Sequence, residues 1–241
     1  MSGKADRFPT THHSAVCAAG SEDQDVRRKS HEHIVEAYWK PLYKYARIKF
    51  RLAPAETEDK IQAFFLIALE KNYFADFDPE KSRFRTFMRL CLDRYIASAT
   101  RNERAQKRGG GHSIVPLDFG EAERELEYIK PDITSPEDTY HREFIRHLFD
   151  RALDALRIEF NTDGKDTHIL LFERYDLADY ENRPTYRSLA EEFELSETQV
   201  TNHLAATRRT FKKIVRNLLW QSCGSEEEFE REVRAIMGMF R

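Results

Sequence analysis

Residues 184–220 combine a short amphipathic segment, a tight turn and a long amphipathic segment. The inward positions of the two segments recur at helical spacing: Tyr186, Leu189, Ala190 and Phe193, then Val200, Leu204, Phe211, Val215 and Leu218. Glu194 and Leu195 form the turn between them, and Ser196 has the side chain expected of an N-cap. The pattern predicts a helix-turn-helix whose second helix runs from Glu197 to about Trp220.

The polar residues of the second predicted helix fall into two groups. Short or hydrogen-bonding side chains lie near its start: Thr198, Gln199, Thr201, Asn202 and His203. Cations follow along its flank: Arg208, Arg209, Lys212, Lys213 and Arg216. Polar groups that reach base edges and cations that meet phosphates are typical of a helix in the major groove of DNA. The alternative is an ordinary amphipathic hairpin.

Helical periodicity also dominates the rest of the chain. We expect one helix to start near Ser30, a second at Pro54, a third over residues 84–108, and an amphipathic helix after Gly224. The last could pack on the DNA-reading domain or be offered to a partner. The predicted fold class is all-α, with two small helical domains joined by an acidic linker and the C-terminal domain a helix-turn-helix.

Charge marks the expected domain boundaries. Residues 81–108 hold nine bases and two acids, whereas residues 118–143 hold nine acids and three bases. The simplest interpretation of the acidic stretch is a solvated surface without a partner. We expect a mobile extension (1–29), a helical domain (30–108), an acidic linker (109–140), a helix-turn-helix domain (141–221) and a helical tail (222–241).

Aromatic and basic residues alternate before and within the third expected helix. This segment contains Phe77, Arg83, Phe84 and Arg85, and cations continue at Arg89, Arg101, Arg104, Lys107 and Arg108. Rings that stack on bases and cations that follow phosphates would suit single-stranded nucleic acid. On spacing alone, however, a core role for the aromatic residues is favoured.

Composition excludes several classes of protein. No apolar run reaches the length of a membrane span, and no signal-peptide pattern opens the chain. The cysteines are Cys17, Cys91 and Cys223, which lack the spacing of a zinc or redox site and suggest a reducing cytoplasm. We find no phosphate loop, catalytic triad or paired catalytic carboxylates, so we expect no enzyme, no cofactor and no metal site.

Seven short segments together resemble bacterial RNA polymerase sigma factors of the extracytoplasmic-function type over nearly the full chain. They are residues 8–11 (FPTT), 37–43 (AYWKPLY), 56–65 (ETEDKIQAFF), 83–87 (RFRTF), 106–111 (QKRGGG), 199–204 (QVTNHL) and 225–229 (SEEEF). Their order and spacing carry the resemblance, since no one of them is decisive.

The resemblance implies that the N-terminal domain docks on the clamp of core RNA polymerase and opens the −10 promoter element. Glu56, Glu58, Asp59 and Gln62 would contact the clamp, and the segment around Phe77 and Phe84 would capture an unstacked base. The C-terminal domain would read the −35 element. Two other classes stay open: a stand-alone helix-turn-helix regulator, which would need a dimer, and a helical adaptor for protein contacts.

Departures from the family pattern limit what carries over. Lys60 and Ala63 make the expected clamp face less acidic, and Thr201 and Ala206 replace common basic residues of the recognition helix. Glu194 stands where glycine is usual, at a cost of about 1 kcal/mol if its backbone is left-handed. Thr57, between two glutamates, is a candidate phosphorylation site that would add negative charge. Candidate regulatory partners are therefore an anti-sigma factor and a serine/threonine kinase.

Overall fold

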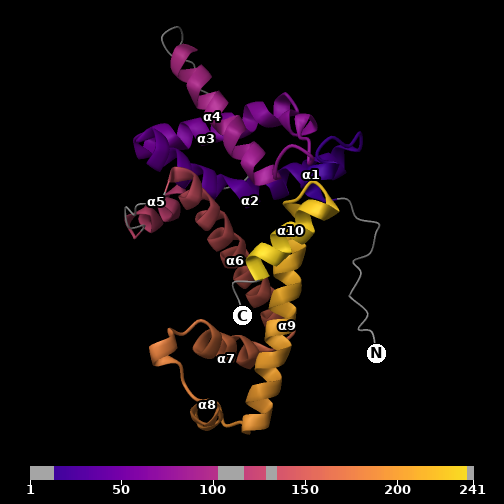
Figure 1. Cartoon of the computed structure of the whole chain (residues 1–241). Helices are drawn as coiled ribbons and strands as arrows, with labels where there is room; N and C mark the ends of the chain where they lie inside the picture. Colours follow the sequence, from indigo (N-terminus) through magenta and orange to yellow (C-terminus); the bar gives the residue numbers. More distant parts are fainter. Residues whose placement is uncertain (1–13, 103–116, 129–134, 238–241) are drawn as a thin grey trace. The chain divides into compact units, whose positions relative to one another are not determined.

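The computed structural model describes residues 14–102, 117–128 and 135–237, and these ranges contain helices but no strand. Figure 1 shows the helices in chain order. They are α1 (Ala15–Ala18), α2 (Gln24–Phe50), α3 (Pro54–Glu70), η1 (Tyr73–Asp76), α4 (Phe84–Asn102), α5 (Phe119–Glu127), α6 (Pro136–Thr162), α7 (Asp166–Asp176), η2 (Tyr180–Asn182), α8 (Tyr186–Glu192), α9 (Glu197–Gln221) and α10 (Glu226–Met237). The all-α prediction is confirmed.

The chain divides into two compact units. Unit 1 comprises Met1–His147 and Leu219–Arg241, and unit 2 comprises Leu148–Leu218. This division differs from the expected domain boundaries, because α5 forms within the segment expected to be a linker and the helical tail belongs to unit 1. Residues 1–13, under half of the expected N-terminal extension, lie outside the described residues, and the rest of that segment is not the unstructured extension expected, because α1 and the start of α2 form within it.

Helix α2 is the central element of unit 1 and contacts α1, α3, α4 and α5. It begins at Gln24, not near Ser30 as expected, because Asp23 caps it by accepting hydrogen bonds from the backbone N–H groups of Asp25 and Val26. Ser30 is instead buried within the helix, where its hydroxyl donates to the Val26 carbonyl at 2.9 Å. Aromatic rings form much of the core around this helix.

Other local predictions hold. Helix α3 begins at Pro54, where the missing N–H of proline costs nothing because the first turn has no intrahelical acceptor. Helix α4 begins at Phe84 and is described as far as Asn102. Helix α8 and the part of α9 up to Leu218 lie in unit 2, where they reproduce the two expected helices and the turn between them around a core that includes Leu156, Phe172 and Leu204.

Candidate nucleic-acid interface

The turn between α8 and α9 fixes where the second helix begins. Glu194 adopts φ +54°, the left-handed conformation that the sequence suggested, and the Leu195 N–H donates to the Ala190 carbonyl at 2.9 Å. Ser196 and Gln199 then form a reciprocal capping box: the Gln199 N–H donates to the Ser196 hydroxyl, and the Ser196 N–H donates to Gln199 Oε1. The left-handed turn at Glu194 and the capping box of Ser196 and Gln199 therefore fix the start of α9.

One face of α9 is polar and open to solvent. The buried face of α9 includes Val200, Leu204, Thr207 and Val215. On the other side, the residues at positions 198, 202, 209 and 213 recur at intervals that keep them on one helical face. This exposed stripe contains Thr198, Thr201, Asn202, Arg209, Lys212 and Lys213.

Four of the predicted DNA-contacting residues in α9 already have intramolecular partners. Gln199 takes part in the capping box, and the Thr201 hydroxyl donates to the Glu197 carbonyl at 2.8 Å. His203 Nδ1 lies 2.8 Å from Nε2 of His168, and Arg208 binds the Asp176 carboxylate through Nε and Nη2. Thr198, Asn202, Arg209, Lys212 and Lys213 are therefore the members of the predicted set best placed to meet a ligand.

The paired imidazoles of His168 and His203 are not joined by a third potential ligand. Across the described ranges, no group of three or more histidine, cysteine or acidic side chains is arranged to hold a metal ion. The pKa of His168 is lowered by burial, by His203 and by the charge of Lys165. The contact between the two rings ties α9 to α7.

The aromatic-basic segment of unit 1 (residues 73–87) is more deeply packed than DNA binding would require. Phe84 is fully buried and Phe74 nearly so, as the core interpretation of these rings anticipated. Phe77 is half-buried, with its ring centroid 5.0 Å from that of Phe84 and 5.4 Å from that of Phe87. Of the predicted aromatic contacts, Phe77 keeps partial exposure and Phe84 does not.

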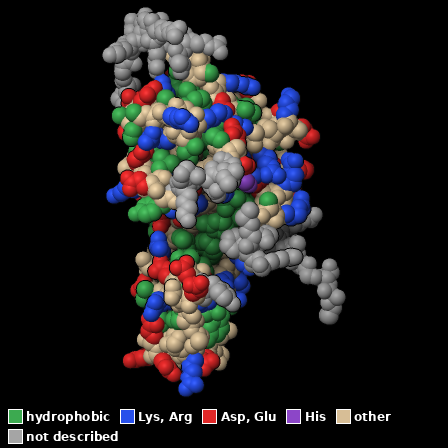
Figure 2. Space-filling view, turned by 60° about the vertical axis from the view of Figure 1, so that its left-hand side comes forward, with side chains coloured by type: hydrophobic (Ala, Val, Ile, Leu, Met, Phe, Trp, Pro, Cys, Tyr) green, Lys and Arg blue, Asp and Glu red, His purple; other side chains and the backbone are tan. Residues whose placement is uncertain are grey.

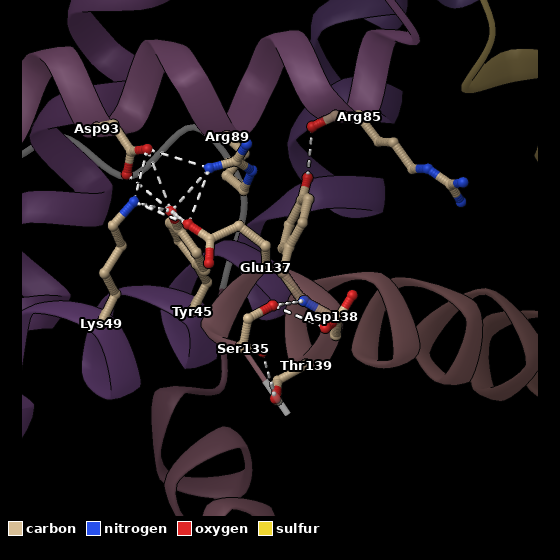
Figure 3. Close-up of polar contacts among 10 residues, drawn as sticks. Tyr45, Lys49, Arg85, Arg89, Asp93, Ser135, Glu137, Asp138 and Thr139 are labelled. Carbon is tan, nitrogen blue, oxygen red and sulfur yellow. Dashed lines mark hydrogen bonds and ion pairs between the residues drawn. The ribbon is translucent and has the colours of Figure 1, made fainter. Parts of the chain in front are cut away.

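The predicted cations of this region also differ in their surroundings. Arg83 is partly exposed, whereas Arg85 is buried, with its guanidinium 5.7 Å from the centre of the Phe144 ring. Arg89 donates to the Tyr45 hydroxyl at 3.0 Å and pairs with Asp93 and Glu137. Figure 3 shows Arg89 within this network and the Arg85 guanidinium turned away from it.

Neither Arg85 nor Arg89 is presented for a phosphate in this structure, because each already has a partner inside unit 1. The side chain of Arg101 and the whole of Arg104, Lys107 and Arg108 lie outside the described residues.

The expected clamp face lies on the first turns of α3. Glu56 and Asp59 are exposed there, and Glu58 and Gln62 are partly exposed and joined by a 3.3 Å hydrogen bond from the Gln62 amide. Lys60 is buried and pairs with Glu56 at 3.5 Å, which moderates the acidity of the face. The four residues are thus close together and accessible.

Thr57 differs from its neighbours on α3. Its side chain is fully buried, and its hydroxyl donates to the Ala53 carbonyl at 2.9 Å. A kinase could reach this hydroxyl only after local opening of the helix. The geometry therefore does not support the phosphorylation site suggested by the sequence.

Sequence reasoning missed the partners of the acidic stretch. Lys44 is buried in α2, where its ammonium pairs with Glu125 at 2.5 Å and with Glu143; Lys40 pairs with the same Glu125 at 2.7 Å. The sequence feature that could have predicted these ion pairs was the spacing of Lys40, Lys44 and Arg47, which places three cations along one side of α2. These acids are structural ion-pair partners, not a purely solvated surface.

On one face of the molecule, the distribution of charged side chains does not single out an interface. On the face shown in Figure 2, acidic and basic side chains are intermixed over most of the described surface. No helix in the described part of the chain is both long and apolar enough to span a membrane.

Comparison of the chain with family models, with curated proteins and with solved structures finds no match.

Proposed function

We propose that this chain is a bacterial RNA polymerase sigma factor of the extracytoplasmic-function type. It would bind core RNA polymerase, recognise the −35 and −10 promoter elements and promote DNA opening in the cytoplasm. The observation that carries the proposal is the exposed stripe of α9 opposite its packed face. Thr198 and Asn202 there are free to reach base edges, while Arg209 and Lys213 are free to reach phosphates.

Unit 1 supplies two supporting features. Glu56 and Asp59 form an accessible acidic face on α3 that suits a basic surface of the polymerase. The aromatic-basic segment contains the half-buried ring of Phe77 and the partly exposed Arg83, a ring and a cation of the kinds that bind a single strand. Both assignments extend the sequence resemblance and rest on it.

The decisive experiment is run-off transcription with purified core polymerase over a genomic fragment library, together with gel filtration of the chain with and without core. A sigma factor should elute with core and initiate transcription at defined promoters. A dimer that binds DNA and ignores core would instead establish a stand-alone helix-turn-helix regulator. Elution with core without any transcript would favour an adaptor.

A matched pair of variants connects this activity with α9. Arg209→Ala/Lys213→Ala removes two exposed cations from the stripe, and Lys29→Ala/Lys71→Ala removes two exposed cations from α2 and from the end of α3. Loss of two phosphate contacts should weaken promoter binding and reduce its salt dependence by about two counterions. The control pair should bind as the parent does, and equal losses in both would refute a role for the stripe.

A further inference from the structure

Helix α10 lies directly against the aromatic-basic segment (residues 73–87) within unit 1. Glu228 is 1% exposed, and its carboxylate accepts the backbone N–H of Phe84 at 2.6 Å and that of Gly224 at 2.9 Å. The Phe84 N–H belongs to the first turn of α4, where backbone donors lack intrahelical acceptors. A tail carboxylate therefore occupies the N-terminus of α4.

A second carboxylate of α10 forms ion pairs with two arginines of the same segment. Glu232 is 2% exposed and pairs with Arg83 at 3.2 Å and with Arg85 at 3.0 Å. Burial lowers the pKa of Arg85, and the charge of Glu232 opposes that shift. The two guanidinium groups nearest Phe84 thus share one carboxylate of α10 as an ion-pair partner.

The junction between α9 and α10 is shaped for this close approach. A Cβ atom at position 224 would lie 2.2 Å from Cε1 of Phe77, so any residue other than glycine would displace that ring. The Tyr38 hydroxyl donates to the Ser222 carbonyl at 3.0 Å, and the Cys17 thiol donates to the Gly224 carbonyl at 3.1 Å. Gly224 therefore covers the half-buried ring that was the best candidate for base stacking.

These contacts use the donors that bind phosphate in other settings. Backbone N–H groups at a helix N-terminus and paired guanidinium groups both prefer anionic oxygens, whether from carboxylate or phosphate. Glu228 and Glu232 supply such oxygens, and Gly224 covers the ring next to them. While α10 stays in place, Arg85 is buried against Glu232 and Phe77 is covered at Gly224, so a strand cannot bind the segment through these two side chains.

We propose that α10 is an intramolecular lid that competes with single-stranded DNA for the aromatic-basic segment, with Glu228 and Glu232 in the places of two backbone phosphates. The inference rests on the proposed function, because the DNA role of this segment does. It makes the tail an autoinhibitory element. Apparent affinity falls with the fraction of open molecules, so a lid closed in about nine of ten molecules lowers it about tenfold.

The first test measures binding of a fluorescent single-stranded oligonucleotide to the full chain at fixed salt. Glu228→Gln/Glu232→Gln weakens the lid, and Glu226→Gln/Glu227→Gln removes the same charge from exposed positions of α10. The lid variant should bind about tenfold more tightly than the parent, and the control about as the parent does. Equal affinities in all three, or the same gain in both variants, would overturn the proposal.

Gly224→Ala tests the same lid without changing charge. Displacement of the Phe77 ring should loosen the junction and raise oligonucleotide affinity in the same direction. Circular dichroism and thermal melting of each variant establish that unit 1 stays folded. A folded Gly224→Ala protein whose affinity matches that of the parent would count against the lid.

Cys223 reports lid opening independently of DNA. Its thiol is 1% exposed and burial raises its pKa, so alkylation should be slow while α10 is docked. In a Cys17→Ser/Cys91→Ala background, which retains a hydroxyl donor towards Gly224, Glu228→Gln/Glu232→Gln should speed alkylation of Cys223. Faster alkylation without tighter DNA binding would show a structural tail and overturn the competition.

Transcription assays separate this inference from the proposed function. If the parent neither binds core polymerase nor initiates transcription, the sigma-factor proposal fails. A tighter oligonucleotide complex of the lid variant would still support the lid in that case. Normal transcription with equal oligonucleotide affinities would overturn the lid and leave the function standing.

Discussion

Arg208 and Asp176 form a two-point ion pair between α9 and α7, with Nε of the arginine 2.9 Å from one carboxylate oxygen and Nη2 2.9 Å from the other. The Arg208 guanidinium also lies 5.5 Å from the centre of the Tyr175 ring. Its neighbour Arg209 is exposed and points into the stripe. Two adjacent arginines of one helix therefore have different roles.

This difference predicts that alanine substitution of Arg208 affects stability, whereas alanine substitution of Arg209 affects DNA binding. Arg208→Ala should destabilise unit 2 by about 1 kcal/mol, since it removes a bidentate, partly exposed pair, and Asp176→Asn should have a similar effect that is not additive with it. Arg209→Ala should leave the melting temperature unchanged and weaken DNA binding. Urea unfolding and a salt titration of DNA affinity measure the two effects, and a destabilised Arg209→Ala would contradict the assignment.

Glu194 predicts a gain in stability from glycine. Its φ of +54° costs a residue with a Cβ about 1 kcal/mol, whereas glycine adopts this conformation freely. Glu194→Gly should therefore raise the free energy of unfolding by up to about 1 kcal/mol. The matched change Glu191→Gly, inside α8, should lower it by about the same amount. Thermal or urea unfolding of both variants checks the sign, and a loss in both would exclude a strained turn.

Local structure was predictable from local residues. Pro54 marked the start of α3, Ser196 the start of α9, and Glu194 the left-handed turn, because caps and turns depend on a few neighbouring side chains. Long-range pairing was not predictable in this way. The bond from Lys40 to Glu125 spans 85 positions and that from Phe84 to Glu228 spans 144, and nothing in either local pattern names its partner.

The candidate interface shows the same contrast between local features, which the sequence predicts, and long-range contacts, which it does not. The exposed stripe of α9 followed from helical periodicity, whereas the occupation of Arg85 by Glu232 and of Arg89 by Glu137 depends on the tertiary fold. A cation in a basic run is free only if no acid from another element reaches it. Sequence alone could not distinguish Arg209 from Arg85.

Burial of Thr57 predicts that a charge at this position is harmful. Thr57→Glu would place a carboxylate where the side chain is fully buried, and should lower the free energy of unfolding by about 3 kcal/mol or more. Thr57→Val keeps the shape and loses the bond to Ala53, which should cost about 1 kcal/mol. Urea unfolding compares the two. A Thr57→Glu protein as stable as the parent would restore the site as a candidate for phosphorylation.

Glu125 predicts how stability depends on acid. Burial would raise the pKa of this carboxyl, but hydrogen bonds and charges from Lys40 and Lys44 outweigh burial and lower the pKa to about 2. Because the folded-state pKa lies below the ordinary value of 4.5, the stabilisation is complete above that value and is lost as the pH falls towards about 2. Unit 1 should therefore lose stability over this interval.

Glu125→Gln removes the titrating group and tests this pH dependence. At neutral pH it should lower the free energy of unfolding by about 2 kcal/mol. This cost is smaller than that of leaving a buried lysine without any acidic partner, because Lys40 keeps Glu121 and Lys44 keeps Glu143. Its melting temperature should then fall less than that of the parent on acidification. Glu127→Gln, an exposed change on the same helix, should melt as the parent does at each pH. Parallel acid curves for the parent and Glu125→Gln would show that the lysine pair does not hold this carboxylate ionised.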